Sequence, residues 1–254
     1  MKPMDIMRAR DYAGQDIKGW YIGEKLDGVR GRWNGERIVS RTGKEIAAPT
    51  WFTDELPAGV VLDGELFVGR GQFQQTLSYV RKNVPIDSEW AKVSFSVFDL
   101  LGQGGIESRF RVAADSIKGS SVACMIQHGI CQDREDMQRF FNEIISVGGE
   151  GIVLRKPGSL YRNGKCNDIL RYKERLFDEA VIESYQPGAG KFTGMVGALL
   201  CRWEGREIKL GTGLTDAVRN NPPALGAPVT FAYKSLTQGG APREPAYIVD
   251  RNYE

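Results

Sequence analysis

The segment Glu24-Lys25-Leu26-Asp27-Gly28-Val29-Arg30 contains a lysine that is followed two residues later by an aspartate and then by a glycine. A lysine amine that has lost its proton is a nucleophile and can carry a transferred group covalently. A free lysine has a pKa of about 10.4, so only a small fraction of such amines is unprotonated at neutral pH. Because so short a motif also arises by chance, its chemistry depends on partners elsewhere in the chain.

The elements that must position this lysine are predicted from the pattern of apolar residues in the first two-thirds of the chain. A short apolar strand at 20–24 leads into Lys25, and Asn34-Gly35 is typical of a two-residue type I′ turn between hairpin strands at 29–33 and 36–40. Further strands are predicted at 60–62, 92–101, 150–155 and 169–173, with helices at 73–82 and after an N-cap at Asp133. Groups that could act on nucleotides stand at the strand ends: Asp63-Gly64-Glu65, Phe98-Asp99, Glu150 and Arg171-x-Lys173.

From about residue 177 the pattern changes to short strands separated by glycine- and proline-rich turns. The strands are predicted at 180–184, 197–203, 207–210 and 229–234, with one short helix at 216–220. Several short strands with a single helix favour a small barrel such as the OB-fold. We therefore predict two domains, at residues 1–176 and 177–254.

The ordered series of motifs resembles that of the covalent nucleotidyltransferases, which include ATP-dependent DNA ligases, RNA ligases and capping enzymes. Within this superfamily the chain most resembles the minimal bacterial ATP-dependent DNA ligases of the ligase E type. The resemblance extends over nearly the whole chain, through Ser40-Arg41-Thr42-Gly43, Gly69-Arg70-Gly71, Glu150-Gly151-Ile152-Val153-Leu154-Arg155 and Pro187-Gly188-x-Gly190-Lys191-Phe192. It implies an α+β adenylation (nucleotidyltransferase) domain of antiparallel sheets and helices, followed by an OB-fold β-barrel.

The resemblance also implies a reaction and a role for each motif residue. Lys25 would attack the α-phosphate of ATP and carry AMP, which then passes to the 5′-phosphate of a nick before the 3′-hydroxyl seals the strand. The implied catalytic residues are Lys25, Asp27, Glu150 and Lys173. The implied ATP or AMP contacts are Glu24, Arg30, Glu65, Phe98 (stacked on adenine), Arg171 and Lys173. The implied DNA contacts are Arg41, Arg70, Arg155, Lys156 and Lys191, while Asp250 and Arg251 are candidates for contacting pyrophosphate.

A divalent metal is required by the charges of this set. The carboxylates of Asp27, Glu65 and Glu150 would favour the protonated amine, whereas a bound cation reverses the local field. We expect Mg²⁺ accompanying ATP, with Mn²⁺ as a substitute, held by Glu65 and Glu150. Arg171 stands where many relatives carry a lysine, and a guanidinium binds phosphate with a different geometry.

The expected partner is nicked double-stranded DNA, and a monomer is expected. The net charge of +2 gives no global field, but residues 155–175 contain seven basic and two acidic side chains, a local surplus suited to phosphates or simply to solvent. No apolar run is long enough to cross a membrane and no leader is visible, so we expect a cytoplasmic protein, or a periplasmic one if a leader was removed.

Three alternatives remain at this point. RNA ligases and capping enzymes share the lysine chemistry, and a non-catalytic nucleic-acid-binding protein could use the same basic stretch. NAD-dependent ligases are disfavoured by the size of the chain and by the absence of paired Cys-x-x-Cys motifs. The spacing of Cys124, His128 and Cys131 suggests a metal site, but it lacks a fourth ligand and lies in a mostly apolar segment that favours a buried strand.

Overall fold

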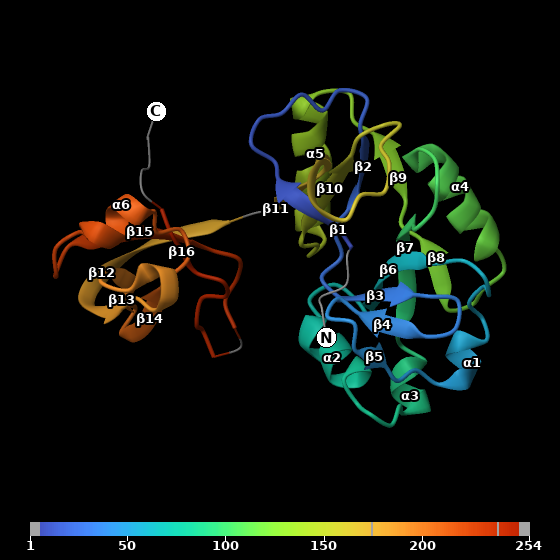
Figure 1. Cartoon of the computed structure of the whole chain (residues 1–254), viewed down its shortest axis with the longest axis horizontal. Coiled ribbons are helices and arrows are strands. Elements are labelled where there is room, and N and C mark those ends of the chain that lie inside the picture. Colours follow the sequence, from blue (N-terminus) through green and yellow to red (C-terminus); the bar gives the residue numbers. More distant parts are fainter. Residues whose placement is uncertain (1–5, 174, 238, 249–254) are drawn as a thin grey trace. The chain divides into compact units, whose positions relative to one another are not determined.

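The computed structural model describes residues 6–173, 175–237 and 239–248. The chain divides into two compact units, Met1–Lys173 and Glu174–Glu254. The sequence placed this division between residues 176 and 177. Figure 1 shows the helices and strands of each unit.

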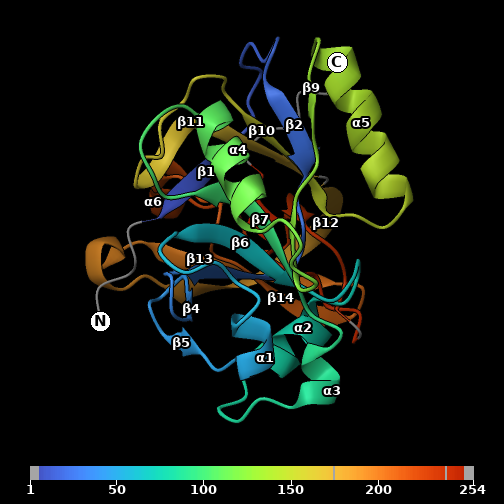
Figure 2. The same cartoon turned by 90° about the vertical axis from the view of Figure 1, so that its right-hand side faces the viewer.

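A five-stranded sheet of the first unit carries Lys25 at the end of one strand. Its strand order is β1-β11-β10-β2-β9, with β1 parallel to β11 and the other pairs antiparallel. The bounds are β1 (Met7–Asp11), β11 (Gly164–Lys173), β10 (Gly151–Arg155), β2 (Tyr21–Glu24) and β9 (His128–Ile130). Helix α5 (Arg134–Ser146) lies along this sheet in both views (Figures 1 and 2). The side chain of Asp133 caps its first turn, as the sequence predicted.

A six-stranded sheet provides the other half of the first unit. Its strand order is β5-β4-β3-β6-β7-β8. The bounds are β5 (Glu45–Ile46), β4 (Ile38–Ser40), β3 (Val29–Trp33), β6 (Leu62–Phe67), β7 (Ser94–Leu100) and β8 (Ala123–Met125). Helices α1 (Thr50–Thr53), α2 (Phe73–Val80) and α3 (Asp87–Trp90) gather beside this sheet, and α4 (Ile106–Ser116) contacts β7 (Figures 1 and 2).

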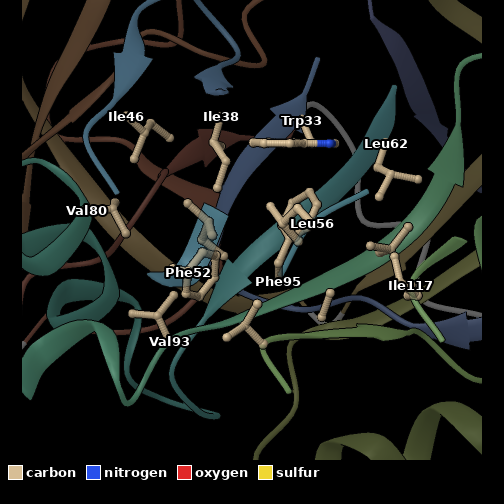
Figure 3. Packing of buried hydrophobic residues seen from close by; sticks show 14 of the residues in the cluster. Trp33, Ile38, Ile46, Phe52, Leu56, Leu62, Val80, Val93, Phe95 and Ile117 are labelled. Carbon is tan, nitrogen blue, oxygen red and sulfur yellow. The ribbon is translucent and has the colours of Figure 1, made fainter. Parts of the chain in front are cut away.

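The apolar core between this sheet and its helices leaves the opposite face of the sheet polar. Trp33, Leu62 and Phe95 pack with Phe52 of α1 in a fully buried cluster (Figure 3). Because side chains alternate along a strand, the residues between the core positions point away from it. This alternation places the polar residues of β3 and β6 on the face toward the five-stranded sheet, where Arg30 of β3 donates to the carbonyl oxygen of Met7 in β1.

Two local expectations for this sheet are wrong in detail. The hairpin of β3 and β4 forms, but only Gly35 has a positive φ, so the turn is not of type I′. Instead the Asn34 side chain accepts hydrogen bonds from the amides of Glu36 and Arg37, which lengthens the connection. The strand expected to end before Asp63 continues to Phe67, so Glu65 lies within β6 and not at its end.

The second unit is a five-stranded antiparallel sheet around its own core. The order is β14-β13-β12-β15-β16, and a bridge between Thr212 and Ala246 links the end of β14 to β16, which brings the two edges together as in a barrel. The bounds are β12 (Leu176–Pro187), β13 (Val196–Trp203), β14 (Arg206–Leu210), β15 (Pro228–Tyr233), β16 (Ala246–Tyr247), α6 (Asp216–Asn220) and the 3₁₀ helix η1 (Gly190–Phe192). A turn with two positive φ angles, at Glu204 and Gly205, joins β13 to β14.

None of the helices in the described residues combines the length and apolar character that crossing a bilayer requires.

Candidate active site

Lys25 is held at the end of β2 by both its backbone and its side chain. Its amide donates to the carbonyl oxygen of Gly151 at 2.8 Å, and its Nζ forms an ion pair with Oε2 of Glu150. The other carboxylate oxygen of Glu150 lies 4.0 Å from Nζ of Lys173. The side chain of Lys25 is 25 % exposed while that of Glu150 is 5 % exposed, so the amine remains reachable and its partner is enclosed. Three residues that are far apart in sequence therefore meet in one cluster.

Two glycines allow these segments to approach. A Cβ on Gly28 would lie 2.3 Å from the carbonyl oxygen of Leu66 and 2.8 Å from Cγ of Glu65, so only glycine brings the lysine segment against β6. Gly151 has a φ of 153°, and a Cβ there would lie 2.4 Å from the carbonyl oxygen of Tyr172. The glycines of the two motifs thus set the spacing between Lys25, Glu65 and Glu150.

The carboxyl group of Glu65 is poorly solvated and lies among charged neighbours. Desolvation raises its pKa to about 8, and the negative charges of Asp63 and Glu150 act in the same direction, against the lowering effect of Lys25 and Arg30. A divalent cation beside this group would favour its ionised form.

The donor set fits a metal that is shared with a substrate. Among the described residues there is no cluster of three or more His, Cys, Asp or Glu side chains that could hold an ion. Mg²⁺ is commonly bound by one or two carboxylates together with substrate phosphates, and Glu65 and Glu150 meet that requirement.

Arg30 forms an ion pair with the buried carboxylate of Asp63. Its guanidinium donates to both carboxylate oxygens of Asp63, at 2.9 and 2.5 Å, and to the carbonyl oxygen of Met7 at 2.8 Å. Asp63 has no exposed surface and also accepts a hydrogen bond from the hydroxyl of Tyr161 at 2.6 Å. This cluster joins the two sheets of the first unit.

A β-bulge determines the position of Phe98. Asp63 pairs with Asp99 and Gly64 with Val97, which leaves Phe98 as the extra residue of β7. Bulges commonly re-aim a side chain beside a functional site. The ring of Phe98 lies 5.2 Å from the guanidinium carbon of Arg30 and 5.4 Å from that of Arg155.

Arg155, which we expected to contact DNA, is buried in the first unit. It is 4 % exposed, and its Nη1 donates to Asp99 at 2.9 Å. Asp99 also binds Arg109, so one buried carboxylate holds two buried guanidiniums. Burial lowers the pKa of Arg155, against the opposing effect of Asp99. The basic stretch expected to face DNA therefore points partly inward.

Two further ion pairs lie beside the cluster of Lys25, Glu150 and Lys173. Arg171 donates to Asp11 at 2.6 and 3.4 Å, on the neighbouring strand β1. Arg70 donates to Glu24 through two bonds of 2.8 and 2.7 Å, so the residue before Lys25 is fixed by a residue expected to contact DNA.

The other residues that the sequence predicted for the site differ in their exposure to solvent. Arg41, Lys156 and Lys191 are exposed, and Asp27 is partly buried between β2 and β3. Asp250 and Arg251 lie outside the described residues. His128 stacks on Phe110 at 4.6 Å, Cys131 is buried and Cys124 is exposed.

The comparisons with known proteins address this arrangement directly. Residues 9–173 match a family model described as ATP dependent DNA ligase domain, and residues 187–251 match one described as DNA ligase OB-like domain. A DNA ligase of Haemophilus influenzae is 32 % identical over 246 residues, which are 96 % of this chain and 91 % of that protein. The chain belongs to the ATP-dependent DNA ligase family.

A solved structure from a study of Lig E DNA ligases matches this ligase with a TM-score of 0.87 and 30 % identity, over 96 % of this chain and 98 % of that one. The adenylate of Chlorella virus DNA ligase, with a TM-score of 0.57 and 23 % identity, shares the fold. The predicted fold class, an adenylation domain followed by an OB-fold, and the resemblance to the ligase E type are confirmed. The family acts on DNA and depends on ATP.

The sequence did not predict the buried residues that pair with the side chains of the site. Asp63 and Asp99 stand inside motifs that were recognised, and their buried partners could have been sought among the arginines. Arg109 and Tyr161 carry no local signal, because their roles depend on contacts 10 and 98 residues away in sequence.

Proposed function

We propose that this ligase seals 5′-phosphate/3′-hydroxyl nicks in duplex DNA through AMP carried on Lys25. The observation that supports this most directly is the ion pair between Lys25 Nζ and Glu150, beside Lys173 and within electrostatic reach of Glu65. The buried carboxylate of Glu150 orients the amine of Lys25, and Nζ of Lys173 lies near the same carboxylate. This is the arrangement expected of an oriented amine nucleophile.

In the first step Nζ of Lys25 gives up a proton to water and attacks the α-phosphorus of ATP, and the nitrogen releases a second proton to water as the phosphoramidate forms. The P–N bond forms as the bond to the leaving oxygen breaks, and pyrophosphate departs with the electron pair. Glu150 orients Nζ before the attack, and Lys173, with Arg171, binds the α-phosphate oxygens. Phe98 provides the stacking surface for adenine, and Glu24 and Glu65 bind the nucleoside.

In the second step an oxygen of the 5′-phosphate at the nick attacks the same phosphorus, and the P–N bond breaks. The amine recovers a proton and AMP now caps the 5′ end. In the third step the 3′-hydroxyl attacks the 5′-phosphorus, loses its proton and expels AMP. We assign Asp27, near the end of β2, to the catalytic residues of these steps. Arg30 is assigned to the phosphate of AMP and Arg41 to the phosphates of the DNA.

We assign Mg²⁺, with Mn²⁺ as a substitute, to Glu65 and Glu150. When bound, the metal would neutralise phosphate charge and favour the unprotonated amine. The position of Glu65 and Glu150 beside Lys25 supports this assignment, because Mg²⁺ is commonly bound by one or two carboxylates together with substrate phosphates.

The duplex contacts proposed for this ligase are the exposed Arg41, Arg70, Lys156 and Lys191, and the enzyme is proposed to act as a monomer. All four cysteines have free thiols, which is typical of a reducing compartment and supports a cytoplasmic location.

Labelling with [α-³²P]ATP and mass spectrometry test the proposal. The wild-type protein should gain one AMP in the presence of Mg²⁺, and Lys25→Ala should gain none, while the exposed control Lys18→Ala should label normally. An adduct that persists in Lys25→Ala would refute the assignment. Labelling with GTP, or sealing of nicked RNA in preference to nicked DNA, would favour the capping enzymes or RNA ligases instead.

A further inference from the structure

We propose that Arg219 and Phe192 form a fixed support that presents Lys191 to a phosphate of the DNA backbone. The inference rests on the proposed action on duplex DNA. It gives a role to Phe192, which follows Lys191 in its motif, and to Arg219, which no sequence motif included. All three side chains belong to the second unit, on η1 and α6.

Arg219 is a buried cation that is stabilised without an acidic partner. It is 7 % exposed, and its guanidinium donates to the carbonyl oxygens of Val196 at 2.9 Å, Gly197 at 2.7 Å and Gly211 at 2.8 Å. Within the described part of the chain it forms no ion pair, and its Nε has no hydrogen-bond partner. Carbonyl dipoles hold the group in place but do not cancel its charge.

The ring of Phe192 contacts two positive charges. The guanidinium carbon of Arg219 lies 4.0 Å from the ring centroid, and Nζ of Lys191 lies 4.5 Å from it. Each cation is attracted to the ring, but the two cations repel one another. Lys191 is exposed and, across the described residues, also forms no ion pair. An anion bound at this point would relieve the repulsion.

The loop that carries Lys191 is closed at its base. The amide of Gly188 donates to the carbonyl oxygen of Met195 at 2.8 Å, and a Cβ on Gly188 would lie 2.1 Å from the carbonyl oxygen of Phe192. A closed loop resting on a buried arginine loses little conformational freedom when it binds. The surplus charge and the fixed geometry together fit a phosphate group.

The phosphate could belong to DNA or to ATP, and we assign it to DNA. Duplex DNA presents phosphates continuously, and each lysine contact with them makes binding more dependent on salt. ATP is instead bound, by our proposal, at Lys25 in the first unit. The two sources are separated by measuring nicked-duplex affinity and ATP dependence in the same variants.

The experiment compares Lys191→Ala, Phe192→Leu and Arg219→Met in the full chain. Each should weaken binding to nicked duplex several-fold and lower the slope of log Kd against log salt by about one. In sealing assays the KM for nicked DNA should rise more than kcat falls, while the KM for ATP in adduct formation stays the same. Arg202→Met removes an exposed arginine of the same unit that pairs with Glu183, and it should bind DNA as the wild type does.

Double variants distinguish positioning from independent contacts. Lys191→Ala combined with Phe192→Leu should bind no more weakly than Lys191→Ala alone, because both remove the same phosphate contact. Additive losses, or an unchanged salt slope in Phe192→Leu, would overturn the inference. So would a rise in the KM for ATP without a loss of DNA affinity.

Phe192→Leu leaves the carbonyl bonds of Arg219 in place, so the test stands even if Arg219→Met fails to fold. Because duplex binding is measured without turnover, failure of this inference is also distinct from failure of the proposed ligation chemistry.

Discussion

At the scale of single residues, the buried carboxylates of this ligase depend on the arginines that pair with them. Asp63 has no exposed surface, and Arg30 supplies its cation. Arg30→Met would leave that charge buried and unpaired, at a cost of about 3–5 kcal/mol in the free energy of unfolding. Urea denaturation measures the loss.

The matched control is Arg37→Met. Arg37 pairs with Glu45 on the surface, where both side chains are more than half exposed, and the loss should stay below about 1 kcal/mol. Equal losses in the two variants would show that burial of the Asp63 pair has no energetic consequence.

His128 makes the stability of the folded chain depend on pH. Burial, reinforced by the charge of Arg155, lowers its pKa from 6.5 to about 4, so the folded state resists protonation. Between pH 6.5 and 4 the unfolded chain binds a proton that the folded chain does not, and stability falls as pH falls. His128→Gln should flatten this part of the stability profile, by on the order of 3 kcal/mol at most. Denaturation at pH 7 and pH 4.5 gives the comparison, and an unchanged slope would contradict it.

At the scale of elements, the approach of the lysine segment to β6 controls the first chemical step. Gly28→Ala would place a Cβ 2.3 Å from the carbonyl oxygen of Leu66 and force the two segments apart. We expect AMP adduct formation to slow by at least about tenfold, since displacements of about 1 Å in a site can cost about 100-fold. Labelling with ATP measures the rate.

The control for this change is Gly129→Ala on β9, where the nearest atom, Cγ2 of Ile22, would lie at an ordinary 3.7 Å. It should label at the wild-type rate. If Gly28→Ala did so too, the close approach to β6 would not matter for the chemistry.

Local sequence patterns predicted those elements whose signals are local. The N-cap at Asp133, the helix at Phe73–Val80 and the short helix Asp216–Asn220 follow from capping and spacing. The bulge at Phe98 and the inward direction of Arg155 were not predictable, because each is set by pairing with a distant strand. The structure brings Lys25, Glu150 and Lys173 together, while the positions of Asp63, Tyr161 and Arg109 depend on tertiary contacts that carry no local signal.

At the scale of the whole molecule, the two units have separate apolar cores. The second core includes Leu199, which is fully buried among Ile182, Cys201 and Phe231. Leu199→Ala should destabilise the second unit by about 2–5 kcal/mol through the cavity that it leaves. Calorimetry should show one transition shifted while the transition of residues 1–173 keeps its midpoint. Equal shifts of both would show that the units unfold together.

Because Phe98 is an extra residue in β7, the number of residues in that strand determines which side chains enter the core. Inserting one residue between Phe98 and Asp99 would exchange the inward and outward sides of the rest of the strand, because the side-chain period is two, whereas deleting Phe98 would remove the bulge. After the insertion Leu100 would exchange places with Asp99, and a carboxylate would enter the apolar core. Substitutions in this strand should therefore accumulate between related ligases far more readily than insertions or deletions.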